Sequence, residues 1–178
     1  MNNIIVKDDL FDQTFIDLFH DFCATNAHWE YGRKSALNKE NLIWGAVLWE
    51  PGIYRNFFVE YIFKKFSETY NIKAEVLSCV LNGQTAGQDT TWHVDLYDDD
   101  LDVDNKFTLI YYVNSTWKDQ AGSTVLKLDS NNQPEHKINF VPGRVLFFPS
   151  NLQHYAESPE LDNLLRITCA YKLKMIGN

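Results

Sequence analysis

His93 and Asp95 stand two residues apart in the stretch TTWHVDLYDDD, residues 90–100. Residues i and i+2 of a strand point to the same face, so this pair could bind one ion from the end of a strand. A second histidine would complete a set of two imidazoles and one carboxylate, which suits iron(II) and leaves other coordination positions open. The H-x-D pair alone is weak, because it also occurs by chance in surface loops.

The best candidate for the third ligand is His154, in the segment FFPSNLQHYAESPE. It follows an apolar strand and a tight turn that contains proline. His136 is the competitor, but it lies among polar residues in PEHKINF and is typical of the solvent face of a strand. His28 has no carboxylate two residues away. The sequence therefore favours His93, Asp95 and His154.

A charged residue interrupts the apolar run LLRITCAYKL, where Arg166 stands at the centre. Burying a guanidinium without a partner costs several kcal/mol, so Arg166 needs an anion, and the run itself contains no acidic residue. Thr168 lies two residues further on and shares its face. A guanidinium can donate two parallel hydrogen bonds, so together with a neighbouring hydroxyl it suits a carboxylate ligand. A small dicarboxylate would therefore fit this pair together with the metal triad.

Short runs rich in β-branched and aromatic residues, separated by turn-forming segments, follow residue 71. Two helices are expected before them, over residues 8–22 and from Pro51 onwards, whereas residues 25–49 have no clear period. This order predicts a mainly β fold with N-terminal helices, a β-sandwich or barrel braced by helices. The expected strands cover residues 72–81, 106–114, 123–128, 136–141, 143–149 and 164–173.

The bulk composition limits the possible functions of this 178-residue chain, whose net charge is -8. Its length suits one domain, and its acidity disfavours a nucleic-acid partner. No apolar run is long enough for a membrane helix, and the start of the chain does not resemble a signal peptide. Three cysteines without a C-x-x-C motif suit a reducing compartment, so we expect a cytoplasmic protein in which Cys79 and Cys169 are core residues.

Taken in order, the motifs of residues 76–173 resemble those of the iron(II)/2-oxoglutarate-dependent dioxygenases, in the prolyl 4-hydroxylase-like branch. The resemblance implies a double-stranded β-helix, a distorted jelly roll whose open end holds the iron. It also implies one oxygenase domain over residues 1–178, with a helical brace over about 1–71 and the jelly-roll core over about 72–174. The motifs that carry it are WHVD, FTLIYYVN, AGSTVL, PGRVLFFPSNLQHYAESP and RITCAYK.

The same resemblance implies a role for each site residue. His93, Asp95 and His154 would bind iron(II), and Arg166 would pair with the far carboxylate of the cosubstrate 2-oxoglutarate, helped by Thr168. Relatives often add a hydroxyl from the strand that matches FTLIYY, for which Thr108 is the first choice and Tyr111 the second. Molecular oxygen would be the oxidant, and ascorbate is a candidate accessory reductant. Many prolyl 4-hydroxylases have lysine in place of Arg166, which points to the wider family.

The implied reaction is hydroxylation of an unactivated C–H bond, with a prolyl residue of a peptide or protein as the first candidate substrate. The alternatives are a free amino acid or another small metabolite, or a cupin-like protein that binds a ligand without turnover. A zinc hydrolase could use the same three ligands, but it would give Arg166 no role. Five aspartates between Asp98 and Asp104 suggest a rim loop, which we hypothesise to be a lid that favours cationic substrates.

Overall fold

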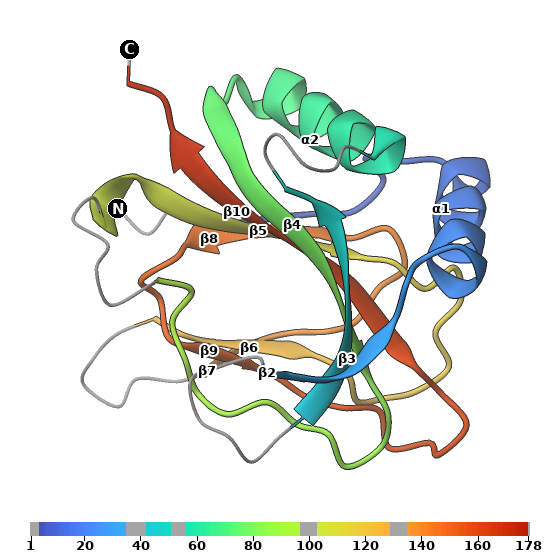
Figure 1. The fold of residues 1–178 in the computed structure, drawn as a ribbon. Coiled ribbons are helices and arrows are strands. Elements are labelled where there is room, and N and C mark those ends of the chain that lie inside the picture. Colours follow the sequence, from blue (N-terminus) through green and yellow to red (C-terminus); the bar gives the residue numbers. More distant parts are fainter. Residues whose placement is uncertain (1–3, 35–41, 51–55, 97–102, 129–134, 178) are drawn as a thin grey trace.

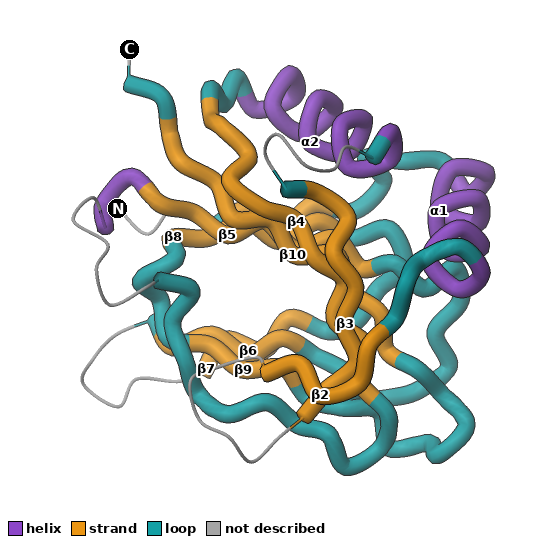
Figure 2. The backbone as a smooth tube through the Cα atoms, viewed as in Figure 1, coloured by secondary structure: helices purple, strands orange, loops and turns teal. Residues whose placement is uncertain are grey.

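Two antiparallel β-sheets face each other in the computed structural model, which describes residues 4–34, 42–50, 56–96, 103–128 and 135–177. Figures 1 and 2 show the larger sheet above the smaller one, with both helices on the outer side of the larger sheet. In the described residues, the larger sheet has the order β1 (Ile5–Lys7), β8 (Val145–Pro149), β5 (Lys106–Tyr112), β10 (Arg166–Met175), β4 (Ala74–Gln84), β3 (Leu42–Trp49) and β2 (Glu30–Lys34). The smaller sheet has the order β7 (Glu135–Ile138), β6 (Thr124–Lys127) and β9 (His154–Ala156).

The two helices begin at side-chain caps. Asp12 precedes α1 (Gln13–Thr25) and accepts a hydrogen bond from the backbone N–H of Phe15 at 2.8 Å. Asn56 caps α2 (Phe57–Tyr70) in the same way, accepting from the N–H of Phe58 at 2.9 Å. Each cap satisfies a backbone donor that the helix leaves unpaired. A short 3-10 helix, η1 (Val103–Asn105), leads into β5.

Alternation along β5 separates two apolar cores. Leu109 and Tyr111 point to the outer face of the larger sheet and pack with the helices. Ile110 and Tyr112 point to the inner face, where they meet side chains of the smaller sheet such as Leu126. The inner face of the larger sheet is therefore the one that can reach residues on β9.

The predicted mainly β jelly roll with N-terminal helices is confirmed, and strands β4 to β8 and β10 fall within or next to the expected runs. The expected helical brace over about 1–71 needs a correction, because β1, β2 and β3 also lie there and extend the larger sheet at both edges. Residues 25–49 had no clear period because Gly45 interrupts the apolar run of β3 and β2 is short and polar. That residues 1–178 form one domain stays a prediction.

Two further sequence expectations can be compared with the structure. Cys79 and Cys169 are buried, and their thiols share a hydrogen bond at 3.1 Å without a disulfide, as expected for core residues. Among the described residues, no helix has the length and apolar character to cross a membrane. The aspartate-rich rim loop lies outside the described residues for most of its length, so the lid hypothesis stays a prediction.

Candidate metal centre

The two histidines of the triad are joined through their backbones. The N–H of His93 donates to the carbonyl of His154, and the N–H of His154 donates to the carbonyl of His93, both at 2.9 Å. The segment that carries His93 thereby extends the smaller sheet at β9. This pairing brings residues that are 61 positions apart side by side, with ring centroids 4.3 Å from each other.

Asp95 is anchored to the opposite side of the interior. Its N–H donates to the carbonyl of Ser150 at 2.8 Å, and the N–H of Ser150 donates to the carbonyl of Lys106 at 2.9 Å. The ligand segment is therefore bound to β9 at His93 and to the start of β5, through Ser150, at Asp95. Such fixed backbone positions are what a preformed metal site requires.

Each imidazole is oriented by a backbone carbonyl. Nδ1 of His93 lies 2.7 Å from the carbonyl oxygen of Thr91, and Nδ1 of His154 lies 3.0 Å from that of Leu152. A neutral ring that donates from Nδ1 keeps its lone pair on Nε2, which is the atom a metal would use. Burial lowers the pKa of His154 to about 4, because the charged ring is poorly solvated, so this imidazole is neutral at pH 7.

The ligand atoms of the triad lie close enough for one ion. Nε2 of His93 lies 3.9 Å from Oδ1 of Asp95, and Nε2 of His154 lies 3.6 Å from Oδ2. All three ligand atoms lie within 4.8 Å of one another. Two atoms bound to one ion at about 2.1 Å each are at most about 4.2 Å apart, so the observed set needs only a small adjustment. The predicted residues are together, and their donor set fits iron(II).

Thr108 reaches this centre, but its partner is the carboxylate of Asp95. Its hydroxyl donates to Oδ2 of Asp95 at 2.8 Å and lies 3.0 Å from the hydroxyl of Ser150, and the residue is fully buried. A hydroxyl in this position orients a ligand carboxylate. The structure therefore places Thr108 at the Asp95 carboxylate, and its contact with the cosubstrate stays a prediction.

Lys172 is a residue of the centre that the sequence analysis missed. It lies on β10 and forms an ion pair with the Asp95 carboxylate, and its ammonium also donates to the Asp95 backbone carbonyl at 3.3 Å. Burial would raise the pKa of Asp95, but the Lys172 ammonium and, at low pH, the protonated form of His154 outweigh it and hold that pKa well below its usual range. Asp95 is therefore ionised, and in the structure its charge is met by a lysine.

Arg166, at the start of β10, is enclosed by neutral acceptors. Its Nε donates to the carbonyl of Gly122 at 2.6 Å, and its two terminal nitrogens donate to Oε1 of Gln84 at 2.8 Å and to Oγ1 of Thr124 at 3.1 Å. Gly122 has a φ of 86°, which favours glycine, and a side chain there would collide with the ring of Trp117.

The guanidinium remains a cation in this enclosure. Burial lowers the pKa of Arg166 to about 10, which is still well above neutral pH. In the described part of the chain no carboxylate forms an ion pair with it. The three contacts use one N–H of each nitrogen, so one N–H on each terminal nitrogen is left over. Two spare donors on one guanidinium match the two oxygens of a carboxylate.

The other two predicted cosubstrate residues lie on opposite faces. Thr168 is buried on the same face of β10 as Arg166, and its strand neighbours are Tyr112 and Asn82. Tyr111 points away from the triad and packs against Phe11 and other aromatic rings of the helical side. The structure therefore does not bring Tyr111 to the site.

Tyr112 is the tyrosine of β5 that faces the interior. Its hydroxyl donates to Oγ1 of Thr124 at 2.8 Å, the same oxygen that accepts from Arg166, and the guanidinium carbon lies 5.8 Å from its ring centroid. The signal was in the sequence, since Tyr112 shares a face with Thr108. His136, the competing histidine, is exposed on β7 and is not part of the cluster.

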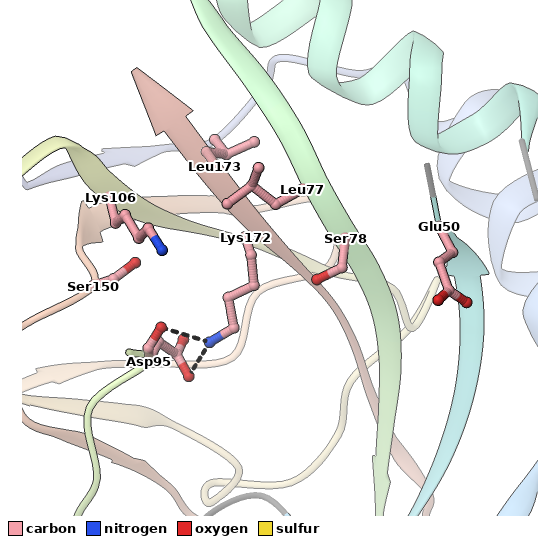
Figure 3. Close-up of a pocket in the computed structure, with 8 residues that line it drawn as sticks. All are labelled: Glu50, Leu77, Ser78, Asp95, Lys106, Ser150, Lys172 and Leu173. Carbon is pink, nitrogen blue, oxygen red and sulfur yellow. Dashed lines mark hydrogen bonds and ion pairs between the residues drawn. The ribbon is translucent and has the colours of Figure 1, made fainter. Parts of the chain in front are cut away.

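A cavity of about 260 Å³ adjoins the Asp95 side of the centre. Figure 3 shows its lining, with Lys106, Ser150 and Lys172 grouped around the Asp95 carboxylate and Glu50 on the far side of β4. The site thus combines three metal-type ligands, a buried cation with spare donors and an adjoining space with polar walls.

The sequence of this site also matches a known protein family. The model of the 2OG-Fe(II) oxygenase superfamily matches residues 77–171, which is more than half of the chain. This range contains the triad and Arg166. No curated protein sequence matches the chain.

Similar solved structures include three prolyl hydroxylases. That of Trichoplax adhaerens, in complex with a peptide of hypoxia inducible factor, is 16% identical with a TM-score of 0.72, covering 98% of this chain and 84% of that one. A Pseudomonas putida prolyl-4-hydroxylase is 13% identical with a TM-score of 0.69, covering 99% and 95%. A collagen prolyl hydroxylase of Paramecium Bursaria Chlorella virus-1 is 15% identical with a TM-score of 0.66, covering 97% and 96%. These likenesses show the fold.

Proposed function

Because the chain belongs to the 2OG-Fe(II) oxygenase superfamily, we propose that it is a hydroxylase of an unactivated C–H bond, most directly that of a prolyl residue in a peptide or protein. The family implies iron(II), 2-oxoglutarate and molecular oxygen as cofactors. In this proposal His93, Asp95 and His154 bind the iron, and Arg166 binds the far carboxylate of 2-oxoglutarate.

The observation that carries the cosubstrate assignment is the environment of Arg166. A fully buried guanidinium surrounded by neutral acceptors has no ion pair among the described residues, and it retains one N–H on each terminal nitrogen. A dicarboxylate that binds at the metal with one end would bring its other carboxylate to such a cation. A zinc hydrolase with the same triad would leave this arrangement without a purpose.

The residues of the chain have separate tasks in the reaction. Iron, when bound, supplies the oxidative chemistry that couples decarboxylation of 2-oxoglutarate to hydroxylation of the substrate. Asp95 is held ready by Thr108, and the two imidazoles are oriented by the carbonyls of Thr91 and Leu152. The apolar side chains between the sheets keep water away from the reacting atoms.

The prolyl substrate is supported by the three prolyl hydroxylases that share the fold. The same fold also occurs in a carbocyclase of nogalamycin biosynthesis, which is 10% identical with a TM-score of 0.68, covering 98% of this chain and 80% of that one. A small metabolite, such as a free amino acid, is therefore the second candidate. The small volume of the cavity beside Asp95, about 260 Å³, favours a small reacting group in either case.

Anaerobic titration with iron(II) and 2-oxoglutarate tests the proposal. A weak visible charge-transfer band should appear only when both are present, and Asp95→Ala should abolish it. Succinate release should then be measured against peptide and amino-acid pools, with ascorbate present to keep the iron reduced. Absence of the band with the intact protein would contradict the oxygenase assignment, and stimulation by amino acids alone would replace the peptide substrate.

A further inference from the structure

The side chain of Gln84 connects the two sheets at the Arg166 end of the site. Gln84 is the last residue of β4 and the direct strand partner of Arg166 in the larger sheet. It is 1% exposed, and its Oε1 accepts a hydrogen bond from a terminal nitrogen of Arg166 at 2.8 Å. Its Nε2 donates to the carbonyl of Gln88 at 2.7 Å and to that of Ala156, on β9 of the smaller sheet, at 3.3 Å. One amide therefore joins the guanidinium to β9 and to the turn that follows β4.

The orientation of this amide is fixed by its neighbours. The carbonyl oxygens of Ala156 and Gln88 only accept hydrogen bonds, whereas the nitrogens of Arg166 only donate them. The amide nitrogen must therefore face the carbonyls, and the amide oxygen must face the guanidinium. The Gln88 carbonyl is held by a closed turn, in which the N–H of Gln88 donates to the carbonyl of Thr85 at 3.1 Å and the N–H of Thr85 donates to Oε1 of Gln88 at 2.7 Å. Turning the amide over would break all three contacts of Gln84.

The strand that Gln84 reaches also carries a metal-type ligand. His154 and Ala156 lie two residues apart on β9, which is about 7 Å at the usual rise per residue. Thr124, whose hydroxyl accepts from Arg166 at 3.1 Å, is the direct strand partner of Ala156. Arg166 belongs to the larger sheet, yet Gln84 and Thr124 tie its guanidinium to the strand of His154. These contacts therefore fix the position of the guanidinium relative to the metal centre.

We propose that Gln84 is a positioning residue, whose amide holds the guanidinium of Arg166 at a fixed distance from the metal centre and thereby selects the length of the dicarboxylate that the site binds. This inference rests on the proposed function, in which one end of 2-oxoglutarate binds at the metal and the far carboxylate meets Arg166. A dicarboxylate of another length would place its far carboxylate where a fixed guanidinium cannot follow. Buried donors left unpaired in this way are a strong source of specificity.

Binding of three related 2-oxo acids tests this role. The protein is loaded with manganese(II) without oxygen and titrated by calorimetry with 2-oxoglutarate, with 2-oxoadipate, which is one carbon longer, and with 2-oxopentanoate, which lacks the far carboxylate. The unaltered protein should prefer 2-oxoglutarate over 2-oxoadipate. Gln84→Met keeps the length of the side chain but removes the amide, so it should reduce this preference about fivefold, as expected for the loss of one hydrogen bond. The affinity for 2-oxopentanoate should not change.

A second variant and a control accompany this measurement. Gln84→Asn keeps the amide but is one methylene too short to reach both Arg166 and Ala156, so it should reduce the preference as well, and it decides the test if the methionine variant does not fold. Gln13→Met removes an exposed amide on α1 and should keep the preference. The inference is overturned if the folded Gln84 variants keep the preference of the unaltered protein. It is also overturned if the affinities for all three acids fall together, because that result indicates a purely structural role.

The unaltered protein distinguishes the two levels of failure. If it binds 2-oxoglutarate without a preference over 2-oxoadipate, the positioning role is contradicted and the proposed function stands. If it binds no 2-oxoglutarate and shows no charge-transfer band with iron(II), the proposed function is contradicted and the role of Gln84 falls with it.

Discussion

Arg166 and Lys172 are two cations on the same inner face of β10, but their surroundings differ. Arg166 is 1% exposed and is held by three neutral acceptors, Gln84 at the end of β4 and two residues of the segment 122–124. Lys172 lies six residues along the strand, about 20 Å at the usual rise per residue. Its side chain is 23% exposed, and its charge is met by the carboxylate of Asp95.

The difference shows two ways in which one strand can present positive charge. The buried guanidinium is fixed in place before any ligand arrives, so an incoming anion meets preorganised donors. The lysine already forms an ion pair with a carboxylate of the chain itself, that of Asp95. A fixed cation of this kind suits the far carboxylate of 2-oxoglutarate in the proposed function, whereas the lysine is tied to a residue that would bind the metal.

Asp95→Ala should have the largest effect, because the Asp95 carboxylate pairs with Lys172 and, in the proposed function, also binds the metal. Loss of a supporting contact at a metal site typically costs 10- to 100-fold, so loss of a ligand should lower turnover by more than about a hundredfold. His154→Ala should behave in the same way, whereas His136→Ala, on the exposed face of β7, should stay close to normal. Succinate release at fixed iron concentration measures all three. Near-normal turnover of the Asp95 variant would refute the ligand assignment.

Arg166→Ala should act at the other end of β10. A charge-assisted contact is worth roughly 1.5–3 kcal/mol, so the concentration of 2-oxoglutarate needed should rise about 10- to 150-fold. Arg166→Lys should be intermediate, because a point charge replaces the fork. Initial rates against 2-oxoglutarate concentration provide the measurement. An unchanged requirement in the alanine variant would place the far carboxylate elsewhere.

Lys172→Met should have a smaller effect and the opposite sign on metal binding. Removing the ammonium frees the Asp95 carboxylate from a competing cation, and a partly exposed ion pair is worth about 1 kcal/mol. Manganese(II) should therefore bind about three- to tenfold more tightly, as followed by its paramagnetic resonance signal during titration. Lys64→Met serves as the charge-matched control and should bind like the original protein. Weaker binding to the Lys172 variant would show that this lysine supports the centre.

Much of this site was predictable because its signals are local. H-x-D on a strand end, a histidine after a proline turn and an arginine within an apolar run each have a reason that neighbouring residues supply. The even spacing from Arg166 to Lys172 also placed both on one face, but nothing in the sequence shows that Lys172 would reach Asp95. That contact depends on how the segment after β4 crosses the interior, which is a tertiary property.

The position of each hydroxyl along β5 could not be predicted for a related reason. Because side chains alternate between the two faces of a strand, Thr108 and Tyr112 face one way and Tyr111 the other. The sequence does not show, however, where along the inner face the metal and the cosubstrate would lie. In the structure, the Thr108 hydroxyl donates to the carboxylate of Asp95, whereas the ring of Tyr112 lies beside the guanidinium of Arg166. Strands β2 and β3 were missed because a central glycine and a polar edge strand weaken the period on which the assignment depends.

The adjacent tyrosines of β5 allow the smallest and most local test, with Tyr111→Phe and Tyr112→Phe as matched variants. The Tyr112 hydroxyl donates to Thr124, which also accepts from Arg166, so its loss should loosen the setting of the guanidinium. We expect the 2-oxoglutarate requirement to rise about two- to fivefold and the free energy of unfolding to fall by about 1 kcal/mol.

The Tyr111 hydroxyl is buried on the helical side of the sheet and has no hydrogen-bond partner among the residues that the structure describes. Because an unsatisfied buried hydroxyl is unfavourable, Tyr111→Phe should leave stability unchanged or raise it by up to about 1 kcal/mol. The 2-oxoglutarate requirement should not change, since the ring faces away from Arg166. Denaturant unfolding and rates against 2-oxoglutarate should be measured for both variants. If Tyr111→Phe raises the requirement and Tyr112→Phe does not, the inner face of β5 has been assigned to the wrong tyrosine, and the link between Tyr112 and Arg166 is refuted.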